Sequence, residues 1–354
     1  MPTLCLLTSG GDAPGMNTAV AAAAKVGLAA GCRVLGVRNG YKGLMAGDFV
    51  PLGADAVRDA WRRGGTVLGS RRSQTFRTPE GRADAAARLF ALDEFKGLLV
   101  IGGDGSLTGG HLLANEHGVP VMGLPASIDN DLACTSLAIG VDTALNTIVE
   151  ACDRIADTAR SHRRVFLVEV MGRRCGFLAM GAGIAAAADA VLVPERFQTP
   201  EALLDEVSEL VTRAFTRSDP RDHLLILKAE GVDVPTEELA QHIRDLLAGI
   251  DADVGTRTAV LGHLVRGGSP SRMDRLIASR MAHAAVRSLL EGHTDQMCGW
   301  DGREPGGEPT VDPRVSRYAL SQVLRDSKAL ISGEHPSTQA RLKLLDAVAG
   351  VLAL

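Results

Sequence analysis

The sequence predicts an α/β protein with two Rossmann-like lobes, in which mostly parallel sheets are sandwiched by helices. Three observations lead to this prediction. Short apolar runs typical of buried strands recur along the 354 residues, longer Ala- and Leu-rich amphipathic stretches lie between many of them, and two of the runs end in Gly-rich turns. Strands that alternate with helical stretches form βαβ units, and helices then cover both faces of the parallel sheet.

The apolar runs expected to be strands are Leu4–Thr8, Arg33–Val37, Leu98–Ile101, Val121–Leu124, Val165–Val170, Ala190–Val193, Leu224–Leu227 and Thr258–Leu261. The amphipathic stretches expected to be helices include Met16–Ala30, Ala144–Thr158, Pro200–Phe215 and Glu237–Gly249. The segment Asp301–Pro313 is rich in Gly and Pro, which is typical of a surface connection. The sequence contains no short repeat and no low-complexity tract.

Composition excludes several classes of protein. Hydrophobic residues make up 45% and charged residues 23% of the chain, as in ordinary soluble proteins. A net charge of −4 without a basic block, together with only 3% aromatic residues, argues against a nucleic-acid-binding protein. No apolar run approaches the length of a membrane span, and the six scattered cysteines read as buried thiols of a reducing compartment. We therefore expect a cytoplasmic protein without membrane partners.

Two Gly-rich turns follow predicted strands and precede predicted helices. The first is Gly10–Gly15, and the second is Gly102-Gly103-Asp104-Gly105-Ser106. This arrangement directs backbone N–H groups and a helix N-terminus at an anion. Asp104 can hold Mg²⁺, which prefers one or two carboxylates plus phosphate oxygens, and Ser106 can donate from the helix start. An ordinary βα turn and an N-cap residue are the alternative interpretations.

The segment Pro125-Ala126-Ser127-Ile128-Asp129-Asn130-Asp131 follows the next predicted strand. Asp129 and Asp131 are two residues apart, so an extended loop points both carboxylates the same way. One can act as the base for an attacking hydroxyl and the other as a metal ligand or orienting group. Asp-Asn-Asp is also favourable turn chemistry, which is the alternative. Beside the Gly-rich segments, the loop predicts a phosphoryl-transfer site.

Cationic side chains gather at strand ends and Gly turns. They are Arg71, Arg72, Arg77, Arg164, Arg173, Arg257, Arg266 and Arg272. Any one of them alone reads as a solvated surface residue, but the set suits a nucleotide or a doubly phosphorylated product. His263, at the end of the apolar run Ala259–Gly262, is the only histidine placed in the site, and a hydrogen-bonded structural histidine is its alternative.

These residues resemble one family, the 6-phosphofructokinases of the bacterial type, almost continuously from Leu6 to about Glu291. The resemblance is carried by Leu7–Asn17, Gly64–Ser70, Gly102–Ser106, the Asp129 loop, Val168–Arg173, Val260–His263 and Arg266–Pro270. It implies that residues 1–142 with about 255–305 form a nucleotide-binding lobe. Residues from about 143 to 254 with 306–354 then form a sugar-phosphate-binding lobe.

The resemblance also implies roles for single residues. Asp129 is similar to the base that takes the proton of the sugar 1-hydroxyl, and Ser127 stands where the family usually has Thr. Asp104 and Asp131 resemble the Mg²⁺-linked carboxylates, and Arg173 resembles the transition-state arginine. The residues that resemble the nucleotide pocket are Gly11, Tyr41, Arg72, Arg77, Gly103, Gly105, Ser106 and Gly109, with Gly11 and Arg72 near the transferred group.

The sugar site implied by the resemblance comprises Met171, Gly172, Glu230, His263 and Arg266 of one subunit. Arg164 and Arg257 resemble a pair that reaches the 6-phosphate from a neighbouring subunit, which implies a homotetramer. The expected substrates are ATP and fructose 6-phosphate. Pyrophosphate users generally carry Asp where Gly105 stands and Lys where Ala126 stands, so the two small residues favour ATP.

The chain departs from the family in places that concern regulation and substrate. Regulated bacterial members carry arginines where this chain has Ala21, Ala54 and Ala156, and only Lys25 keeps a cation, so we expect a weak response to ADP and phosphoenolpyruvate. The region of Phe177 and the tail after about Trp300 leave another ketose phosphate open, such as sedoheptulose 7-phosphate. A non-catalytic sugar-phosphate sensor is a further alternative, although it has no need of a base at Asp129.

Overall fold

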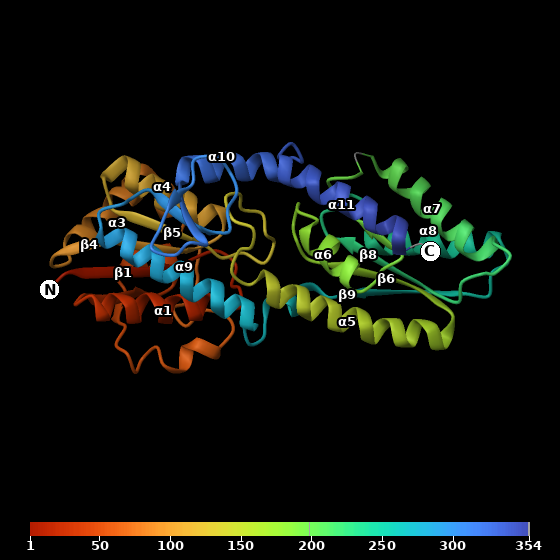
Figure 1. Cartoon of the computed structure of the whole chain (residues 1–354), viewed down its shortest axis with the longest axis horizontal. Helices are drawn as coiled ribbons and strands as arrows, with labels where there is room; N and C mark the ends of the chain where they lie inside the picture. The colour runs from red at the N-terminus through yellow and green to blue at the C-terminus, as the bar shows by residue number, and fades with distance from the viewer. Residues whose placement is uncertain (198, 353–354) are drawn as a thin grey trace. The chain divides into compact units, whose positions relative to one another are not determined.

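The computed structural model describes residues 1–197 and 199–352, which divide into two α/β units (Figure 1). Unit 1 contains Met1–Thr143 and Arg266–Lys328, and unit 2 contains Ala144–Val265 and the chain from Ala329 onward. Each unit has its own sheet with helices packed on it. The predicted α/β class with mostly parallel sheets is confirmed.

Unit 1 is built on an eight-stranded sheet of order β11-β12-β10-β5-β4-β1-β2-β3. Its strands are β1 (Thr3–Thr8), β2 (Arg33–Val37), β3 (Phe49–Pro51), β4 (Phe95–Gly102), β5 (Val121–Pro125), β10 (Gln296–Trp300), β11 (Glu308–Pro309) and β12 (Val315–Ala319). The five central strands β10, β5, β4, β1 and β2 are parallel, while the remaining strands pair antiparallel at the two edges. All of β1 and β5 is buried, as expected of strands covered on both faces.

The helices of unit 1 are α1 (Met16–Ala29), α2 (Gly40–Ala46), α3 (Pro79–Phe90), α4 (Asp104–His117), α9 (Arg272–Leu290) and most of α10 (Leu320–Ile331), with short 3₁₀ turns η1 (Asp59–Arg62) and η2 (Thr75–Arg77). Helices α1 and α9 pack side by side against the sheet, and α4 contacts β4 and β5 (Figure 1). Side-chain hydrogen bonds cap the N-termini of two of these helices. Thr78 accepts the N–H of Gly81 ahead of α3, and Ser271 accepts the N–H of Asp274 ahead of α9.

Unit 2 has a four-stranded, fully parallel sheet of order β7-β8-β6-β9. Its strands are β6 (Arg164–Val170), β7 (Ala190–Leu192), β8 (Leu224–Ala229) and β9 (Gly255–Val260). Its helices are most of α5 (Val141–His162), α6 (Phe177–Ala185), α7 (Pro200–Thr216), α8 (Thr236–Gly249) and α11 (Pro336–Leu352), and the 3₁₀ turn η3 (Gly262–Arg266) follows β9. Helix α11 packs on α6, so the end of the divergent tail belongs to unit 2.

All eight predicted strands and all four predicted helices are present, with ends shifted by a few residues. The unit boundaries differ from the predicted ones in two segments. Residues 255–265, expected in the first lobe, belong to unit 2 because β9 hydrogen-bonds along β6. Residues 306–328, expected in the second lobe, belong to unit 1 because β12 pairs with β10. The expected surface connection at Asp301–Pro313 contains the two-residue strand β11.

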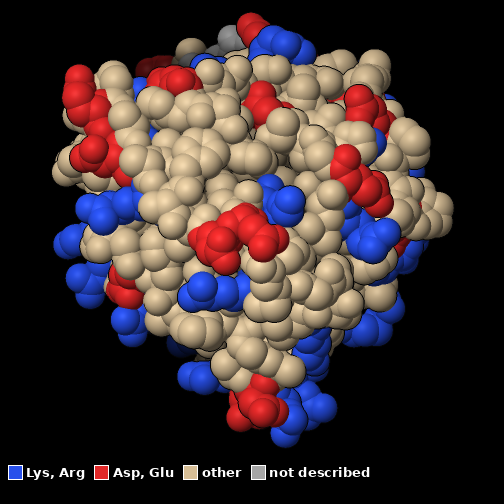
Figure 2. Space-filling view, turned by 90° about the vertical axis from the view of Figure 1, so that its left-hand side faces the viewer, with Lys and Arg blue, Asp and Glu red and all other residues tan. Residues whose placement is uncertain are grey.

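All six cysteines are buried. No helix among the described residues is long and apolar enough to cross a bilayer. Figure 2 shows one face of the molecule, on which acidic and basic side chains are interspersed. Charges of opposite sign form ion pairs, for example Arg82 with Glu116 at 2.5 Å and Arg280 with Asp312 at 2.6 Å.

Candidate active site

Three loops of unit 1 meet at the carboxyl edge of its sheet, because β1, β4 and β5 are parallel neighbours. Backbone hydrogen bonds join them: the N–H of Ser9 donates to Ile101 (3.1 Å) and the N–H of Ala126 donates to Gly102 (3.0 Å). A Cβ at Gly10 would lie 3.1 Å from Ser106 Oγ, and a Cβ at Gly103 would lie 3.7 Å from Ser127 Cβ. The two Gly-rich loops and the Asp129 loop therefore form one continuous surface.

Helix α4 begins at this surface. Its first residues are Asp104, Gly105 and Ser106, so the positive end of the helix dipole faces the loops. Gly105 is exposed, and a Cβ on it would meet nothing within 4 Å. The structure thus leaves open space beside the start of the helix, which a phosphate chain can use.

The Asp129 loop brings its polar side chains into a defined arrangement. Asp129 is 1% exposed, and its Oδ1 lies 3.7 Å from Nη2 of Arg266. Ser127 donates its hydroxyl proton to Oδ1 of Asp131 at 2.9 Å, which fixes the orientation of both side chains. The same Arg266 also approaches the first loop, since a Cβ at Gly11 would lie 2.6 Å from its Nη1. Gly11, Asp129 and Arg266 are therefore gathered in one place.

Asn130 shapes this loop and was not singled out in the sequence. It adopts a left-handed conformation with φ of 48°, which asparagine tolerates better than most residues. Its side chain accepts the N–H of Ala138 at 2.9 Å and donates to the carbonyl of Ser136 at 3.1 Å. The turn chemistry of Asp-Asn-Asp is therefore confirmed, since Asn130 makes the turn between the two carboxylates. The catalytic role of Asp129 stays a prediction.

Asp104 and Asp131 are the two carboxylates that the sequence predicts to hold a magnesium ion. Among residues 1–197 and 199–352, no three His, Cys, Asp or Glu side chains gather closely enough to hold a metal ion by themselves. Mg²⁺ does not require such a cluster, because it is commonly held by one or two carboxylates while water and phosphate oxygens complete its shell. The lack of a three-residue cluster is therefore compatible with the predicted site for an ion that binds together with a phosphorylated ligand.

The arginines of the predicted nucleotide pocket lie on the segment that follows Gly69. This segment rests on the first Gly-rich loop, since Ser70 donates to the carbonyl of Gly10 at 2.6 Å. Arg72 and Arg77 are both exposed, so their guanidinium groups are accessible to a ligand. The arrangement can bring two cations to the surface that carries Gly11.

Tyr41 and Gly109, both predicted to belong to the nucleotide pocket, are buried and pack closely against each other. Tyr41 is 6% exposed, stacks on Phe76 at 4.0 Å and donates its hydroxyl proton to the carbonyl of Ser106 at 2.6 Å. Its burial raises its pKa. A Cβ at Gly109 would lie 2.7 Å from the Tyr41 ring, so glycine is needed for this close packing. Tyr41 therefore anchors helix α4 by a hydrogen bond to Ser106 and by packing against Gly109.

In unit 2, the predicted sugar residues lie at the carboxyl edge of β6 and β8. Glu230 Oε1 accepts the N–H groups of Gly172 (3.2 Å) and Arg173 (2.7 Å). Arg173 has φ of 52°, an uncommon conformation for arginine that these hydrogen bonds support. Met171 is 9% exposed directly after β6, and His263 is exposed in η3 after β9. Met171, Gly172, Arg173 and Glu230 thus form one cluster.

Arg164 and Arg257 are not part of that cluster. Arg164 opens β6, and the side chains of both arginines approach Gly255 at the amino end of β9. Since β6 has seven residues, its two ends are about 20 Å apart at roughly 3.3 Å per residue. Within one chain, the pair and the Arg173 cluster lie at opposite ends of the strand.

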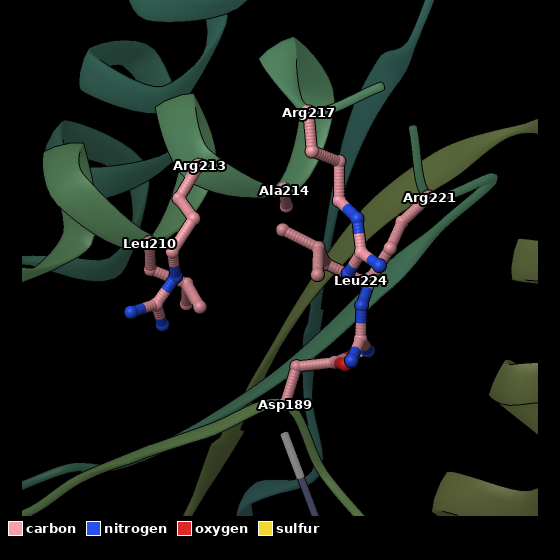
Figure 3. A pocket seen from close by; sticks show the side chains of 7 residues that line it. All are labelled: Asp189, Leu210, Arg213, Ala214, Arg217, Arg221 and Leu224. Carbon is pink, nitrogen blue, oxygen red and sulfur yellow. Dashed lines mark hydrogen bonds and ion pairs between the residues drawn. The ribbon is translucent and has the colours of Figure 1, made fainter. Parts of the chain in front are cut away.

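A separate cavity of about 260 Å³ lies in unit 2 beside the first residue of β8 (Figure 3). Its lining residues are Asp189, Leu210, Arg213, Ala214, Arg217, Arg221 and Leu224. Asp189 forms an ion pair with Arg221 and accepts the N–H of Leu225 at 2.8 Å. None of the predicted site residues lines this cavity.

Comparisons with known proteins agree with this architecture. The family model described as phosphofructokinase matches residues 3–289. The chain is 44% identical to the ATP-dependent 6-phosphofructokinase of Halothermothrix orenii over 306 residues, covering 85% of this chain and 90% of the relative. It is 41% identical to that of Thermotoga neapolitana over 332 residues, covering 94% of this chain and 100% of the relative.

Solved structures give the same result. The phosphofructokinase of Saccharomyces cerevisiae superposes with a TM-score of 0.81 at 32% identity over 100% of this chain, which spans about half (48%) of the yeast chain. The pyrophosphate-dependent phosphofructokinase of Marinobacter aquaeolei shares the fold, with a TM-score of 0.74 at 20% identity over 91% of this chain and 84% of that one. With loops that suit phosphoryl transfer, and with matches over most of its length, the chain belongs to the phosphofructokinase family.

Proposed function

We propose that the chain transfers the terminal phosphoryl group of ATP to the 1-hydroxyl of fructose 6-phosphate, the glycolytic reaction that forms fructose 1,6-bisphosphate. The names of relatives that are 41 to 44% identical support this activity. The observation that carries the mechanism is the buried carboxylate of Asp129 at the meeting point of three loops, beside Arg266 and Gly11.

Asp129 is the proposed general base. It takes the proton of the sugar hydroxyl as that oxygen attacks phosphorus, a role worth roughly 10²–10⁴-fold in rate. Ser127 and Asp131, which are hydrogen-bonded to each other at 2.9 Å, keep the loop in one conformation around it. The bond to the transferred group forms at the sugar oxygen while the bond to the ADP oxygen breaks.

The remaining groups position charge. Backbone N–H groups at Gly11 and at the start of α4, together with Arg72, surround the phosphates, and Arg173 balances charge in the transition state. Asp104 and Asp131 are the proposed holders of Mg²⁺, which supplies charge neutralisation when it is bound with the nucleotide. Catalysis is then mostly orientation and electrostatics.

The donor assignment rests on Gly105 and Ala126. Space is open beside Gly105, while Ala126 is 1% exposed and leaves no cation at its position. An α-phosphate of ATP fits next to glycine, whereas an aspartate there would crowd and repel it.

Weak activation by ADP is expected, because Ala21, Ala54 and Ala156 offer no cation to bind it. A glycolytic role also implies a cytoplasmic enzyme.

Substitution of the base tests the proposal. Asp129→Ser should lower kcat by roughly 10²–10⁴-fold with little change in binding of fructose 6-phosphate, because the hydroxyl cannot take up the proton. Asp84→Ser, an exposed position on α3, is the matched control. Near-normal turnover of Asp129→Ser would contradict the assignment of the base.

A panel of phosphorylated ketoses decides between the alternatives. Measuring kcat/KM for fructose 6-phosphate and sedoheptulose 7-phosphate, with ATP and with pyrophosphate, identifies the preferred acceptor and donor. A sensor would bind a sugar phosphate without releasing ADP. A higher kcat/KM for sedoheptulose 7-phosphate would replace the proposed acceptor while keeping the chemistry.

A further inference from the structure

Lys228 is a fully buried lysine in the middle of unit 2. It is 1% exposed and lies on β8, the strand between β7 and β6. Its Nζ lies 3.3 Å from Oε2 of Glu169 and 3.5 Å from the carbonyl oxygen of Ala229. Glu169 stands directly opposite on β6 and also accepts the hydroxyl proton of Thr236, the first residue of α8. The three side chains tie two strands and a helix start together.

This network lies on β6 and β8, the two strands that lead into the cluster of Met171, Gly172, Arg173 and Glu230. Glu169 is two residues before Met171, and Lys228 is two residues before Glu230, so each is about 7 Å along its strand from the loop. The N–H of Glu230 donates to the carbonyl of Val170 at 2.9 Å, and the N–H of Leu261 donates to the carbonyl of Glu169 at 3.0 Å. The position of Glu230, which holds Arg173 in its left-handed conformation, therefore depends on the register of β6 and β8 beneath it.

Stability alone does not explain such a pair. The Lys228 side chain is 2% exposed, whereas that of Glu169 is 22% exposed. Removing a charged group such as that of Lys228 from water costs several kcal/mol, and well-packed apolar residues in place of an ion pair are often as stable or more stable. Every other residue of β8 is apolar. A charged pair at this point instead restricts the strands to one register, since any shift would leave a buried charge unpaired.

We propose that Lys228, with Glu169 and Thr236, is a positioning residue for the sugar-phosphate loops. The ion pair fixes where β6 and β8 end, and thereby sets the orientation of the Gly172 and Arg173 N–H groups toward Glu230. This inference rests on the proposed assignment of Met171, Gly172 and Glu230 to the sugar phosphate.

The test compares Lys228→Met with Leu227→Met, a core substitution at the adjacent position of the same strand. Lys228→Met should raise the KM for fructose 6-phosphate on the order of tenfold while the KM for ATP changes less than about twofold. Amide hydrogen exchange should speed up at Gly172 and Arg173 and stay unchanged in β1 and β4. Leu227→Met should do neither.

The double variant Lys228→Met/Glu169→Leu distinguishes loss of loop positioning from destabilisation by an unpaired charge. It removes both charges, so its resistance to urea should return toward that of the wild type, while its KM for fructose 6-phosphate should stay raised. Recovery of that KM along with stability would overturn the proposal. Unchanged exchange at Gly172 and Arg173 in Lys228→Met would overturn it as well.

Glu230→Gln distinguishes failure of this inference from failure of the site assignment. If Glu230→Gln raises the KM for fructose 6-phosphate and Lys228→Met does not, the role of Lys228 is overturned while the site stands. If neither variant changes that KM but exchange rises in Lys228→Met, the loop-positioning role stands and the assignment of the loop to the sugar is overturned.

Discussion

Gly105 is one of the two residues on which the proposed choice of ATP as phosphoryl donor rests. It is exposed at the start of α4, and a Cβ there would meet no protein atom within 4 Å. A substitution at this position therefore changes what a ligand meets while leaving the packing of the free protein intact.

Gly105→Asp should lower kcat/KM for ATP severely, because the new carboxylate occupies the space next to the α-phosphate and repels it. The unfolding midpoint should stay near that of the wild type. Steady-state kinetics with ATP, with thermal unfolding as the control for folding, provides the check. Unchanged ATP kinetics would remove the steric basis for the donor assignment.

Asp274 makes the stability of unit 1 depend on pH. It is 0% exposed and accepts the N–H groups of Gly140 and Thr143, each at 2.8 Å. Burial is the largest influence on its carboxyl and raises its pKa from 3.8 to about 6. The folded state then binds more protons than the unfolded state between these two values, so this contribution is largest at low pH and is lost as pH rises to about 6.

Asp274→Asn should remove that pH dependence. The stability advantage of the wild type over the variant should shrink by up to about 3 kcal/mol between pH 4 and pH 7. Urea unfolding of both proteins at the two pH values measures the difference, because the other carboxylates contribute equally to each. Parallel pH profiles for the two proteins would show that Asp274 does not titrate in this range.

At the level of secondary-structure elements, helix α10 of the divergent tail contacts the chain close to the Asp129 loop. Helix α10 reaches the segment behind the Asp129 loop, where Ser327 accepts the N–H of Ala133 at 2.9 Å and donates to the carbonyl of Val323 at 2.7 Å. Ser327 and Ala133 are each 1% exposed. The tail therefore holds the chain two residues after Asp131.

Ser327→Ala should lower the free energy of unfolding by about 1–3 kcal/mol, since it leaves a buried N–H without an acceptor. Ser327→Thr keeps the hydroxyl and should retain more of the stability. The exposed Ser332 near the end of the same helix supplies the control Ser332→Ala. Equal urea midpoints for Ser327→Ala and Ser332→Ala would contradict the role of this hydrogen bond.

How well an element can be predicted from the sequence depends on how deeply it is buried in the fold. The central parallel strands are continuous apolar runs because both faces are covered, so β1, β2, β5 and β6 were read correctly from the sequence. Strand β12 was missed because it carries Arg317, whose partner Glu308 lies across the edge of the sheet. Strand β8 extends two residues beyond the apolar run Leu224–Leu227, because Lys228 is accommodated in the sheet by its ion pair with Glu169.

Long-range pairing also limits how much of the site a sequence can predict. Gly-rich turns and the Asp129 loop are local signals, so their meeting at one sheet edge could be inferred from the order of parallel strands. Lys228 and Ser327 act through partners 59 and 194 residues away. A pairing of that kind leaves no pattern in a single sequence.

At the level of the whole molecule, the placement of Arg164 and Arg257 bears on assembly. They lie at the amino end of the unit 2 sheet, about 20 Å along β6 from the Arg173 cluster at the carboxyl end. A sugar phosphate is far too short to reach both ends in one chain. If Arg164 and Arg257 bind the sugar phosphate, as the resemblance implies, they do so at a site completed by a second copy of the chain, which agrees with an oligomeric enzyme.

Mixing inactive variants tests this arrangement. Asp129→Ser lacks the base, and Arg257→Ala lacks one cation of the pair, so each alone should turn over fructose 6-phosphate poorly. In hybrids formed from equal amounts of the two, about a quarter of the shared sites should combine a wild-type Asp129 with a wild-type Arg257 from the neighbour. Activity should rise above the sum of the parents after the subunits are dissociated and reassembled. If each site were complete within one chain, the mixture would stay at that sum, because no chain carries both wild-type residues.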